Sequence, residues 1–458
     1  MRTLWRLLLF AAAIASGLAG LGYFCLSHPQ LFKPGPYHPM SLYYAHRGVQ
    51  VHPYHSMKDG QYRLVVWETG WPLSWSEHLG FADFVEYMVL GFQESNPNVE
   101  VEFRLIRITE LALALQEARA LDTLPDIYAG PFFPALAEMG AVPLEPFIDE
   151  HELSLYEQAA LEACTVEGSL VAWPRWVEVW GWASTPRFLG DLDASLLAEE
   201  GWSWEEAEDF LLSKAEVAPQ ALVLDSAGTK TFEHLLTAAG VPSVVSPKGE
   251  LLWQGGPVLE VARFLERLKS EGVLPRDTSN MHRRLVADFL KGEVAVAGPA
   301  GSGFLRLCRE VNLAEELAML PVPHPPGGLA LVPAEYNAAT VFDKGDPGRA
   351  ALAARLALHL SRGPMTWLTA RVCGVPAYLP DRQAWRDSVG LPTQVMAFLE
   401  KASQRAAHPA PLDLRHQRGQ AVILYSVILP EIREFWQGKI DHRGLEESIR
   451  YRVKGKEE

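Results

Sequence analysis

Cysteine is scarce in this chain of 458 residues. The four cysteines are Cys25, Cys164, Cys308 and Cys373, and no CxxC pair occurs. Such scattered cysteines indicate neither a disulfide framework nor a zinc site. We expect buried free thiols, with a single 164–308 or 308–373 bridge as the alternative.

Motifs of nucleotide binding and of hydrolysis are also absent. The chain has no GxxxxGK[ST], no GxGxxG between a strand and a helix, no HExxH and no GxSxG. The glycine-rich stretch 298–303 lacks the lysine that would hold phosphates, and the 14 histidines show no pair at metal-ligand spacing. Without a catalytic motif, we expect a protein that is not an enzyme and needs no cofactor or metal ion.

Basic residues are fewer than acidic residues in this chain. Lys and Arg number 41 against 56 Asp and Glu, which gives a formal net charge of −15. This balance argues against nucleic acid as a partner and against a polybasic grip on anionic lipid. Hydrophobic content of 48% and charged content of 21% are ordinary for a globular protein. The length allows two or three domains.

The N-terminus reads as an export segment. Arg2 and Arg6 precede an apolar run from Leu7 to Leu26, which is the pattern of a signal peptide or of an N-terminal membrane anchor within residues 1–27. Cys25 follows the bulky pair Tyr23-Phe24, a poor match to a lipoprotein box. We expect an exported, extracytoplasmic protein anchored to the cytoplasmic membrane, and cleavage, lipidation and retention all stay open. Residues 28–60 are Pro-rich and predict a spacer.

Alternating strands and helices follow the spacer. YRLVVWE from Tyr62 predicts a strand, 81–94 an amphipathic helix, and VEVEFRLI from Val99 a second strand. A helix over 110–121 and a short strand at 124–128 come next. This β-α-β-α-β order predicts a parallel sheet.

The stretch Val171–Ser184, VAWPRWVEVWGWAS, is rich in tryptophan. As one extended strand, its side chains would alternate between two faces. Trp176, Glu178, Trp180 and Trp182 would share one face, opposite small apolar residues. Aromatic faces and a lone carboxylate suit a site for a sugar-like or cationic ligand. The alternative is that these tryptophans belong to the core and rim of a large two-layer protein.

Short motifs recur in an order that resembles one known family. After the first strand come a helix ending before Asn96-Pro97, the VEVE strand and LPDI at 124–127. The later segments are LEPFI at 144–148, EGSLVAWP at 167–174, GWSWEE at 201–206, FLKGEVAV at 289–296, MLPVP at 319–323 and GVP at 374–376. Together, over about 62–450, they resemble extracellular solute-binding protein family 1, the sugar-type receptors of ABC importers. Ser203 and Glu206 also predict a capping box at a helix start.

This resemblance implies an α/β, two-lobed periplasmic-binding-protein-like fold of type II. Each lobe would be a mainly parallel sheet flanked by helices, and hinge crossings would join the lobes. Lobe one would comprise 61–172 plus 328–377, lobe two 173–327 plus 378–450, and 451–458 would be a charged tail. It implies a monomeric receptor that binds a saccharide or similar polar solute between the lobes and delivers it to ABC permease membrane subunits.

The resemblance also places candidate ligand-binding residues. Glu178 matches a family position whose acidic residue accepts hydrogen bonds from sugar hydroxyls; an ion pair with Arg175 or Arg187 is the alternative. The other candidates are tryptophans of the same stretch, residues at strand ends of lobe one, a helix N-terminus and the lobe-one return: Trp173, Trp176, Trp180, Trp67, Glu68, Trp71, Asp126, Tyr128, Ser302 and Asn337. For Trp67, Glu68 and Asp126 the alternatives are inward packing, solvation and support of a loop, respectively.

Two departures from the family pattern limit the choice of ligand. The stretch 299–303 and the pair Leu424-Tyr425 stand where many sugar binders have a tryptophan. A maltodextrin-like ligand is therefore not assumed. A membrane-anchored sensory or interaction protein with the same fold is the alternative function, and a glycan-active hydrolase is a third.

Overall fold

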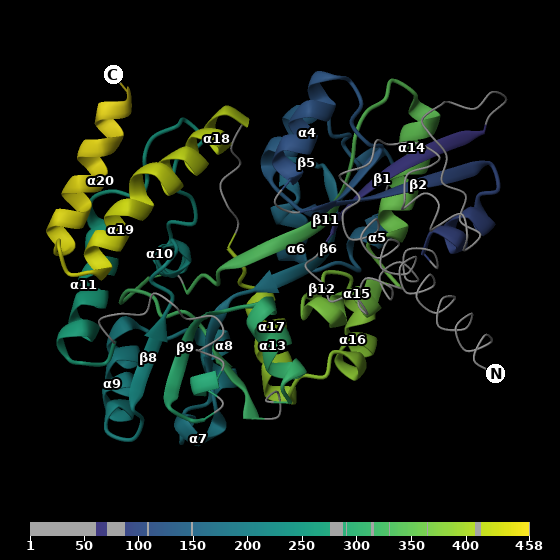
Figure 1. The fold of residues 1–458 in the computed structure, drawn as a ribbon. Coiled ribbons are helices and arrows are strands. Elements are labelled where there is room, and N and C mark those ends of the chain that lie inside the picture. The colour runs from purple at the N-terminus through teal and green to yellow at the C-terminus, as the bar shows by residue number, and fades with distance from the viewer. Residues whose placement is uncertain are drawn as a thin grey trace, which may run out of the picture. The chain divides into compact units, whose positions relative to one another are not determined.

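The computed structural model describes residues 61–70, 88–107, 110–147, 150–274, 287–289, 291–312, 316–328, 330–363, 365–407 and 414–457 (Figure 1). They divide into two compact units. Unit 1 falls within Met1–Ala129 and Phe342–His359, and unit 2 within Gly130–Val341 and Leu360–Glu458. The apolar run at 7–26, the spacer and the residues between Trp71 and Tyr87 lie outside the described residues. Within the described part, no helix is both long and apolar enough for a membrane span.

Unit 1 is built on parallel strands, as the β-α-β pattern predicts. Strand β1 (Tyr62–Gly70) pairs in parallel with β2 (Val99–Arg107) and with β3 (Ile127–Pro131). Helix α4 (Leu111–Ala120) connects β2 to β3, and α14 (Pro347–His359) packs on β1. Of the helix predicted at 81–94, residues 88–95 are described and are helical.

Unit 2 contains a group of long antiparallel strands. Strand β6 (Ala172–Val179) pairs with β11 (Ala334–Val341) and with the short β12 (Val375–Pro376). Figure 1 shows β6 and β11 running side by side. Every residue of β6 is buried, and α6 and α17 both pack on this strand.

A second sheet of unit 2 has the strand order β10-β7-β9-β8. Its strands are β7 (Gly181–Ser184), β8 (Gln220–Leu224), β9 (Val294–Ala300) and β10 (Ala318–Leu320). A large apolar core joins this sheet to α9 (Trp204–Ala215), α10 (Lys230–Ala238), α11 (Gly256–Ser270), α19 (Leu429–Trp436) and α20 (His442–Glu457). The remaining described helices of unit 2 include α5 (Glu150–Leu153), α6 (Gln158–Ala163), α7 (Pro186–Leu189), α8 (Ala194–Glu200), α13 (Ser302–Glu310), α15 (Met365–Val372), α16 (Arg382–Ser388), α17 (Thr393–Ser403) and α18 (Leu414–Ile423).

The sheets are mixed, and not mainly parallel as predicted. Pairing is parallel within β1, β2 and β3 and between β8 and β9, whereas β6–β11, β6–β12, β7–β9 and β7–β10 are antiparallel. The reason is that the chain passes between the two sheets of unit 2 twice. It leaves by β6 and β7 and returns by β10 and β11, so the outgoing and returning strands run in opposite directions.

The stretch Val171–Ser184 is not one strand, which corrects the alternation predicted for it. It breaks at Trp180, and β6 and β7 belong to different sheets. After the break, Gly181 allows β7 to approach β10 closely, because a Cβ there would lie 2.5 Å from the Leu320 carbonyl oxygen. The two halves therefore meet different neighbours, and side chains on the two sides of Trp180 no longer share a face.

Local predictions at the cysteines and at α9 are confirmed. Cys164, Cys308 and Cys373 are buried free thiols. Ser203 caps α9: its Oγ accepts a hydrogen bond from the Glu206 amide at 3.3 Å, and its own amide donates to Glu206 Oε2 at 2.6 Å. The capping box depends on two residues that are close together in the sequence, and the free thiols depend on apolar burial.

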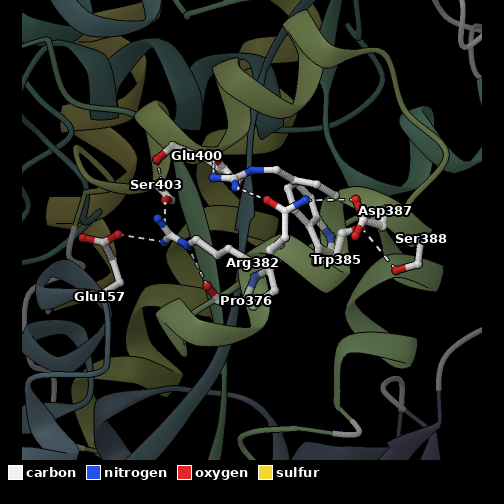
Figure 2. A network of polar contacts seen from close by, with 10 residues as sticks. Glu157, Pro376, Arg382, Trp385, Asp387, Ser388, Glu400 and Ser403 are labelled. Carbon is white, nitrogen blue, oxygen red and sulfur yellow. Dashed lines mark hydrogen bonds and ion pairs between the residues drawn. The ribbon is translucent and has the colours of Figure 1, made fainter.

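A buried arginine ties together four segments of unit 2 (Figure 2). Arg382, at the start of α16, donates to Glu157 Oε2 at 2.7 Å and to the Pro376 carbonyl at 3.3 Å. Its third partner is Ser403 Oγ, at 3.5 Å, at the end of α17. Arg386 follows one turn later and forms two 2.8 Å bonds with the Glu400 carboxylate nearer the surface.

Candidate functional site

Trp180 stands at the point where the chain passes from one sheet of unit 2 to the other. Its amide donates to the Pro333 carbonyl at 2.9 Å, which joins the outgoing and returning connections. Its ring is partly exposed and lies 5.0 Å, centroid to centroid, from the His234 ring on α10. The indole Nε1 is buried and has no hydrogen-bond partner among the described residues.

Three tryptophans of this stretch pack directly against glycines. A Cβ at Gly374 would lie 2.4 Å from Trp176, one at Gly301 2.6 Å from Trp180, and one at Gly298 2.4 Å from Trp182. Distances this short exclude any side chain at these three positions. The position of each indole ring is therefore set by a glycine far away in the sequence.

Alanine at Gly301 is expected to displace the Trp180 ring. Gly301→Ala would place a methyl group 2.6–2.9 Å from three atoms of the indole, and overpacking of this kind typically costs about 1–3 kcal/mol. The expected result is a lower melting temperature and a changed Trp180 environment, measured by thermal unfolding and near-ultraviolet circular dichroism. Gly303→Ala is the matched control, since nothing lies within 4 Å of its Cβ position. Equal effects of the two substitutions would contradict the close packing of the Trp180 ring on Gly301.

A cavity of about 180 Å³ opens beside Trp180. It is smaller than the roughly 300–1,000 Å³ of sites for drug-sized ligands, so it suits a small solute or one part of a larger solute. Its polar lining comes mainly from α10 and from the start of β11. The lining residues are Trp180, Lys230, Glu233, His234, Thr237, Pro242, Val244, Trp253, Pro333, Ala334, Glu335, Ala407, Gln420 and Leu424.

Lys230 provides an ammonium group within this cavity. Its Nζ lies 2.9 Å from Glu335 Oε1, 3.3 Å from Glu233 Oε2 and 5.7 Å from the Trp180 ring centroid. Burial lowers the pKa of Lys230, but the carboxylates of Glu335 and Glu233 outweigh it and raise the pKa above its ordinary value. Lys230 is thus charged throughout the physiological pH range.

His234 is an uncharged histidine in the cavity lining. Burial, followed by the charge of Lys230, lowers its pKa well below the usual value. Its Nδ1 is buried and has no hydrogen-bond partner among the described residues. Since buried polar atoms are normally paired, this ring nitrogen has unused hydrogen-bonding capacity at the cavity wall.

Glu178 is a buried carboxyl group next to the cavity. It accepts hydrogen bonds from Ser302 Oγ at 2.6 Å and from Trp176 Nε1 at 3.3 Å. In the register of β6 and β11 it lies opposite Glu335, which lines the cavity. Burial and then the nearby charge of Glu335 raise the pKa of Glu178 to about 7, against the weaker opposing effects of its hydrogen bonds and of Lys230.

Several solved structures with a similar fold are described as sugar-binding proteins. The cyclic α-maltosyl-1,6-maltose binding protein from Arthrobacter globiformis aligns with a TM-score of 0.65 at 17% identity, covering 85% of this chain and 98% of that one. The sugar-binding protein MalE from Xanthomonas citri aligns with a TM-score of 0.64 at 18% identity, covering 85% and 96%. The chain has the solute-binding-protein fold. An extracellular solute-binding protein family 1 from Alicyclobacillus acidocaldarius is similar too, with a TM-score of 0.63 at 15% identity and coverage of 86% and 98%.

Sequence comparison adds nothing to this structural likeness. No family model matches the chain, and no curated protein matches it either. At such low identities the likeness shows the fold alone. The predicted fold class, an α/β fold of the periplasmic-binding-protein type, is confirmed.

The solute-binding-protein fold brings four predicted site residues together. Ser302 and Trp176 both bond to Glu178, and Trp180 is two residues further along the chain. Ser302 is the first residue of α13, as predicted for a helix starting near 299–303. Arg175 donates to the Leu360 carbonyl and to Asn337 Oδ1, each at 3.2 Å.

Other predicted residues of unit 2 are deep in the core. Trp173 and Trp176 are 1% and 0% exposed, so neither offers a ring face to a solute in this structure. Trp173 packs against the Tyr156 ring at 5.3 Å. Asn337 is buried, and its Nδ2 has no hydrogen-bond partner among the described residues. Trp180 is thus the tryptophan of the stretch that reaches the cavity.

The predicted residues of unit 1 are also buried. Trp67 packs inward, and Glu68 is buried, not solvated. Asp126 accepts hydrogen bonds from the Val65 amide at 2.7 Å and from Arg349 Nη2 at 2.8 Å, an arrangement that supports the chain around it. Tyr128 has its hydroxyl 3.4 Å from Thr69 Oγ1. Trp71 lies outside the described residues.

Sequence reasoning missed Lys230, Glu233, His234 and Glu335. Lys230 and Glu335 are 105 residues apart, and no motif marks either of them. Only the pairing of β6 with β11 could have pointed to Glu335, since it places this residue opposite Glu178.

Proposed function

We propose that this protein is an extracytoplasmic receptor that binds a saccharide or similar polar solute and passes it to an ABC permease without chemical change. The observation that carries the proposal is that the partly exposed Trp180 ring lines a cavity together with charged side chains. An indole face packs on the apolar face of a sugar ring, and carboxylate and ammonium groups bind its hydroxyls. The sugar-binding proteins that share the fold support the same conclusion.

Within the site, each group has a distinct role. Trp180 provides the stacking surface, and Glu335 and Lys230 provide a hydrogen-bond acceptor and a donor at the cavity mouth. Glu178, held by Ser302 and Trp176, provides a further acceptor at greater depth. A few well-placed polar groups around an aromatic ring are typical of small-molecule sites.

Hinge closure is part of the proposal. The lobes would be 61–172 plus 328–377 and 173–327 plus 378–450. Since β6 pairs with β11 of lobe one, the first boundary would move from 172–173 to Val179–Gly181, and the hinge would include this connection and the one between β10 and β11. The segment 1–27 would export the protein and hold it at the membrane, and the receptor would act as a monomer.

A ligand panel tests the proposed function. Isothermal titration calorimetry with neutral and amino monosaccharides, neutral oligosaccharides, polyamines and short peptides is expected to show saturable binding of a saccharide. A ligand at about 100 times its Kd would also stabilise the protein by roughly 2.7 kcal/mol in thermal unfolding. Binding of peptides or polyamines alone would contradict the saccharide assignment. Release of reducing ends from a glycan would contradict a purely binding role.

A further inference from the structure

Glu178 contrasts with three other well-buried carboxylates, each of which has an arginine partner. Glu102 lies 3.1 Å from Arg63, Asp126 bonds to Arg349, and Glu431 lies 2.7 Å from Arg452. Glu178 is equally buried, at 6% exposure, yet its donors are the neutral groups of Ser302 and Trp176. A buried carboxylate without a cation is costly, so a cation that enters from the cavity would stabilise the charged form of Glu178.

The groups around Glu178 do not supply that partner. Glu335, the residue opposite on β11, is itself acidic. Lys230 is already bound to Glu335 and Glu233, and its effect on Glu178 is the weakest of those acting there. The thiol of Cys373 is also close to Glu178, but burial raises its pKa, so it is uncharged at neutral pH. In the cavity lining, the carboxyls of Glu233 and Glu335 thus face the ammonium of Lys230. Arg306 and Arg309 also lie near Cys373, and they are bound to Glu310 and to the Ala370 carbonyl, respectively.

The cavity wall is also suited to a cation. The Trp180 ring already has the Lys230 ammonium 5.7 Å from its centroid, which is within the range of a cation–π contact. His234 is uncharged and does not repel a positive group. Its Nδ1 is a buried polar atom at the cavity wall without a partner among the described residues, so it can accept a hydrogen bond from a donor group of the ligand.

We propose that the solute is an amine-bearing saccharide whose ammonium group pairs with the Glu178 carboxylate while its ring packs on Trp180. This inference rests on the proposed function. An ammonium group is a donor only, so it matches a carboxylate better than a hydroxyl does. Acidic and phosphorylated sugars are excluded by the same surplus of carboxyls.

Matched monosaccharides test this inference. Glucosamine, galactosamine and mannosamine are titrated at pH 6, each beside its parent sugar and its N-acetyl form, which lacks the charge. At least one amino sugar is expected to bind about tenfold or more tightly than both of its analogues, a difference typical of a charge-assisted hydrogen bond. Parent sugars that bind as tightly would overturn the inference and leave the proposed function standing. A failure of every saccharide in the panel would overturn both.

Proton release provides a second readout. Because the pKa of Glu178 is about 7, the group is mostly protonated at pH 6, and pairing with an ammonium lowers its pKa. Binding should therefore release close to one proton at pH 6, where the amine of the sugar is already protonated, and should take up protons at pH 8, where the carboxyl is ionised and the amine is largely neutral. Titrations in two buffers of different ionisation enthalpy measure this number. Binding of the amino sugar without proton release at pH 6 would overturn the pairing with Glu178.

Substitution of Glu178 separates charge recognition from folding. Glu178→Gln removes the charge but keeps both hydrogen bonds, because its carbonyl oxygen can accept from Trp176 Nε1 and its amide can donate to Ser302 Oγ. The amino sugar should lose its preference of about tenfold, the proton release should disappear, and the melting temperature should not fall. Glu152→Gln, a surface position paired with Arg362, is the control and should bind like the wild type. A preference that persists in Glu178→Gln would overturn the inference.

Discussion

Replacing Trp180 by alanine is expected to remove most of the affinity for the solute. The side chain provides the aromatic face of the cavity, and Trp173 and Trp176 are too deeply buried to replace it. Loss of the buried ring area and of the specific stacking contact should cost about 2–4 kcal/mol of binding free energy. Calorimetry with the saccharide that binds the wild type measures the loss directly.

Two further variants make this result specific. Trp180→Phe keeps an aromatic face and should retain most of the affinity. Tyr451→Ala removes an aromatic ring that is 81% exposed on α20 and does not line this cavity, so it should bind like the wild type. If Trp180→Ala bound the solute normally, the cavity beside Trp180 would not be the binding site.

Replacing Arg382 by alanine is expected to destabilise the protein strongly. The guanidinium is buried and joins Glu157, the Pro376 carbonyl and Ser403 (Figure 2). Its removal leaves the carboxylate of Glu157, which is 12% exposed, without its cation. Breaking a buried pair in this way typically costs about 3–5 kcal/mol, which denaturant unfolding of the full chain would measure as a lower transition midpoint.

Arg386→Ala is the matched control on the same helix. Its guanidinium is 40% exposed and pairs with Glu400 nearer the surface, where solvent screens the interaction. Exposed pairs contribute about 0–1 kcal/mol, so a small change is expected. Similar losses for Arg382→Ala and Arg386→Ala would show that burial is not what makes the Arg382 network important.

Local features of this protein followed from the sequence. The parallel pairing of β1, β2 and β3 was predictable because the three strands and their connecting helices lie within about 70 residues, where apolar periodicity indicates each element. The capping box of α9 was predictable because Ser203 and Glu206 are three residues apart. The fold class was predictable because several short motifs occur in a fixed order, although each motif alone is weak.

Only the tertiary structure decided which tryptophan reaches the cavity. Alternation along Val171–Ser184 could not reveal the break at Trp180, because a regular strand and two strands in different sheets show the same pattern of residue types. Likewise, no sequence signal shows that Gly301 makes room for the Trp180 ring. Close approach between distant segments is a property of packing, not of local pattern.

By itself, the sequence determined the order of strands and helices, the helix cap and the class of fold, since these depend on neighbours along the chain. The tertiary structure decided the chemistry of the site. It placed Lys230 against Glu335, 105 residues away, and left Glu178 buried beside them with only neutral donors. Charge and burial act through space, and spatial neighbours are known only after the chain has folded.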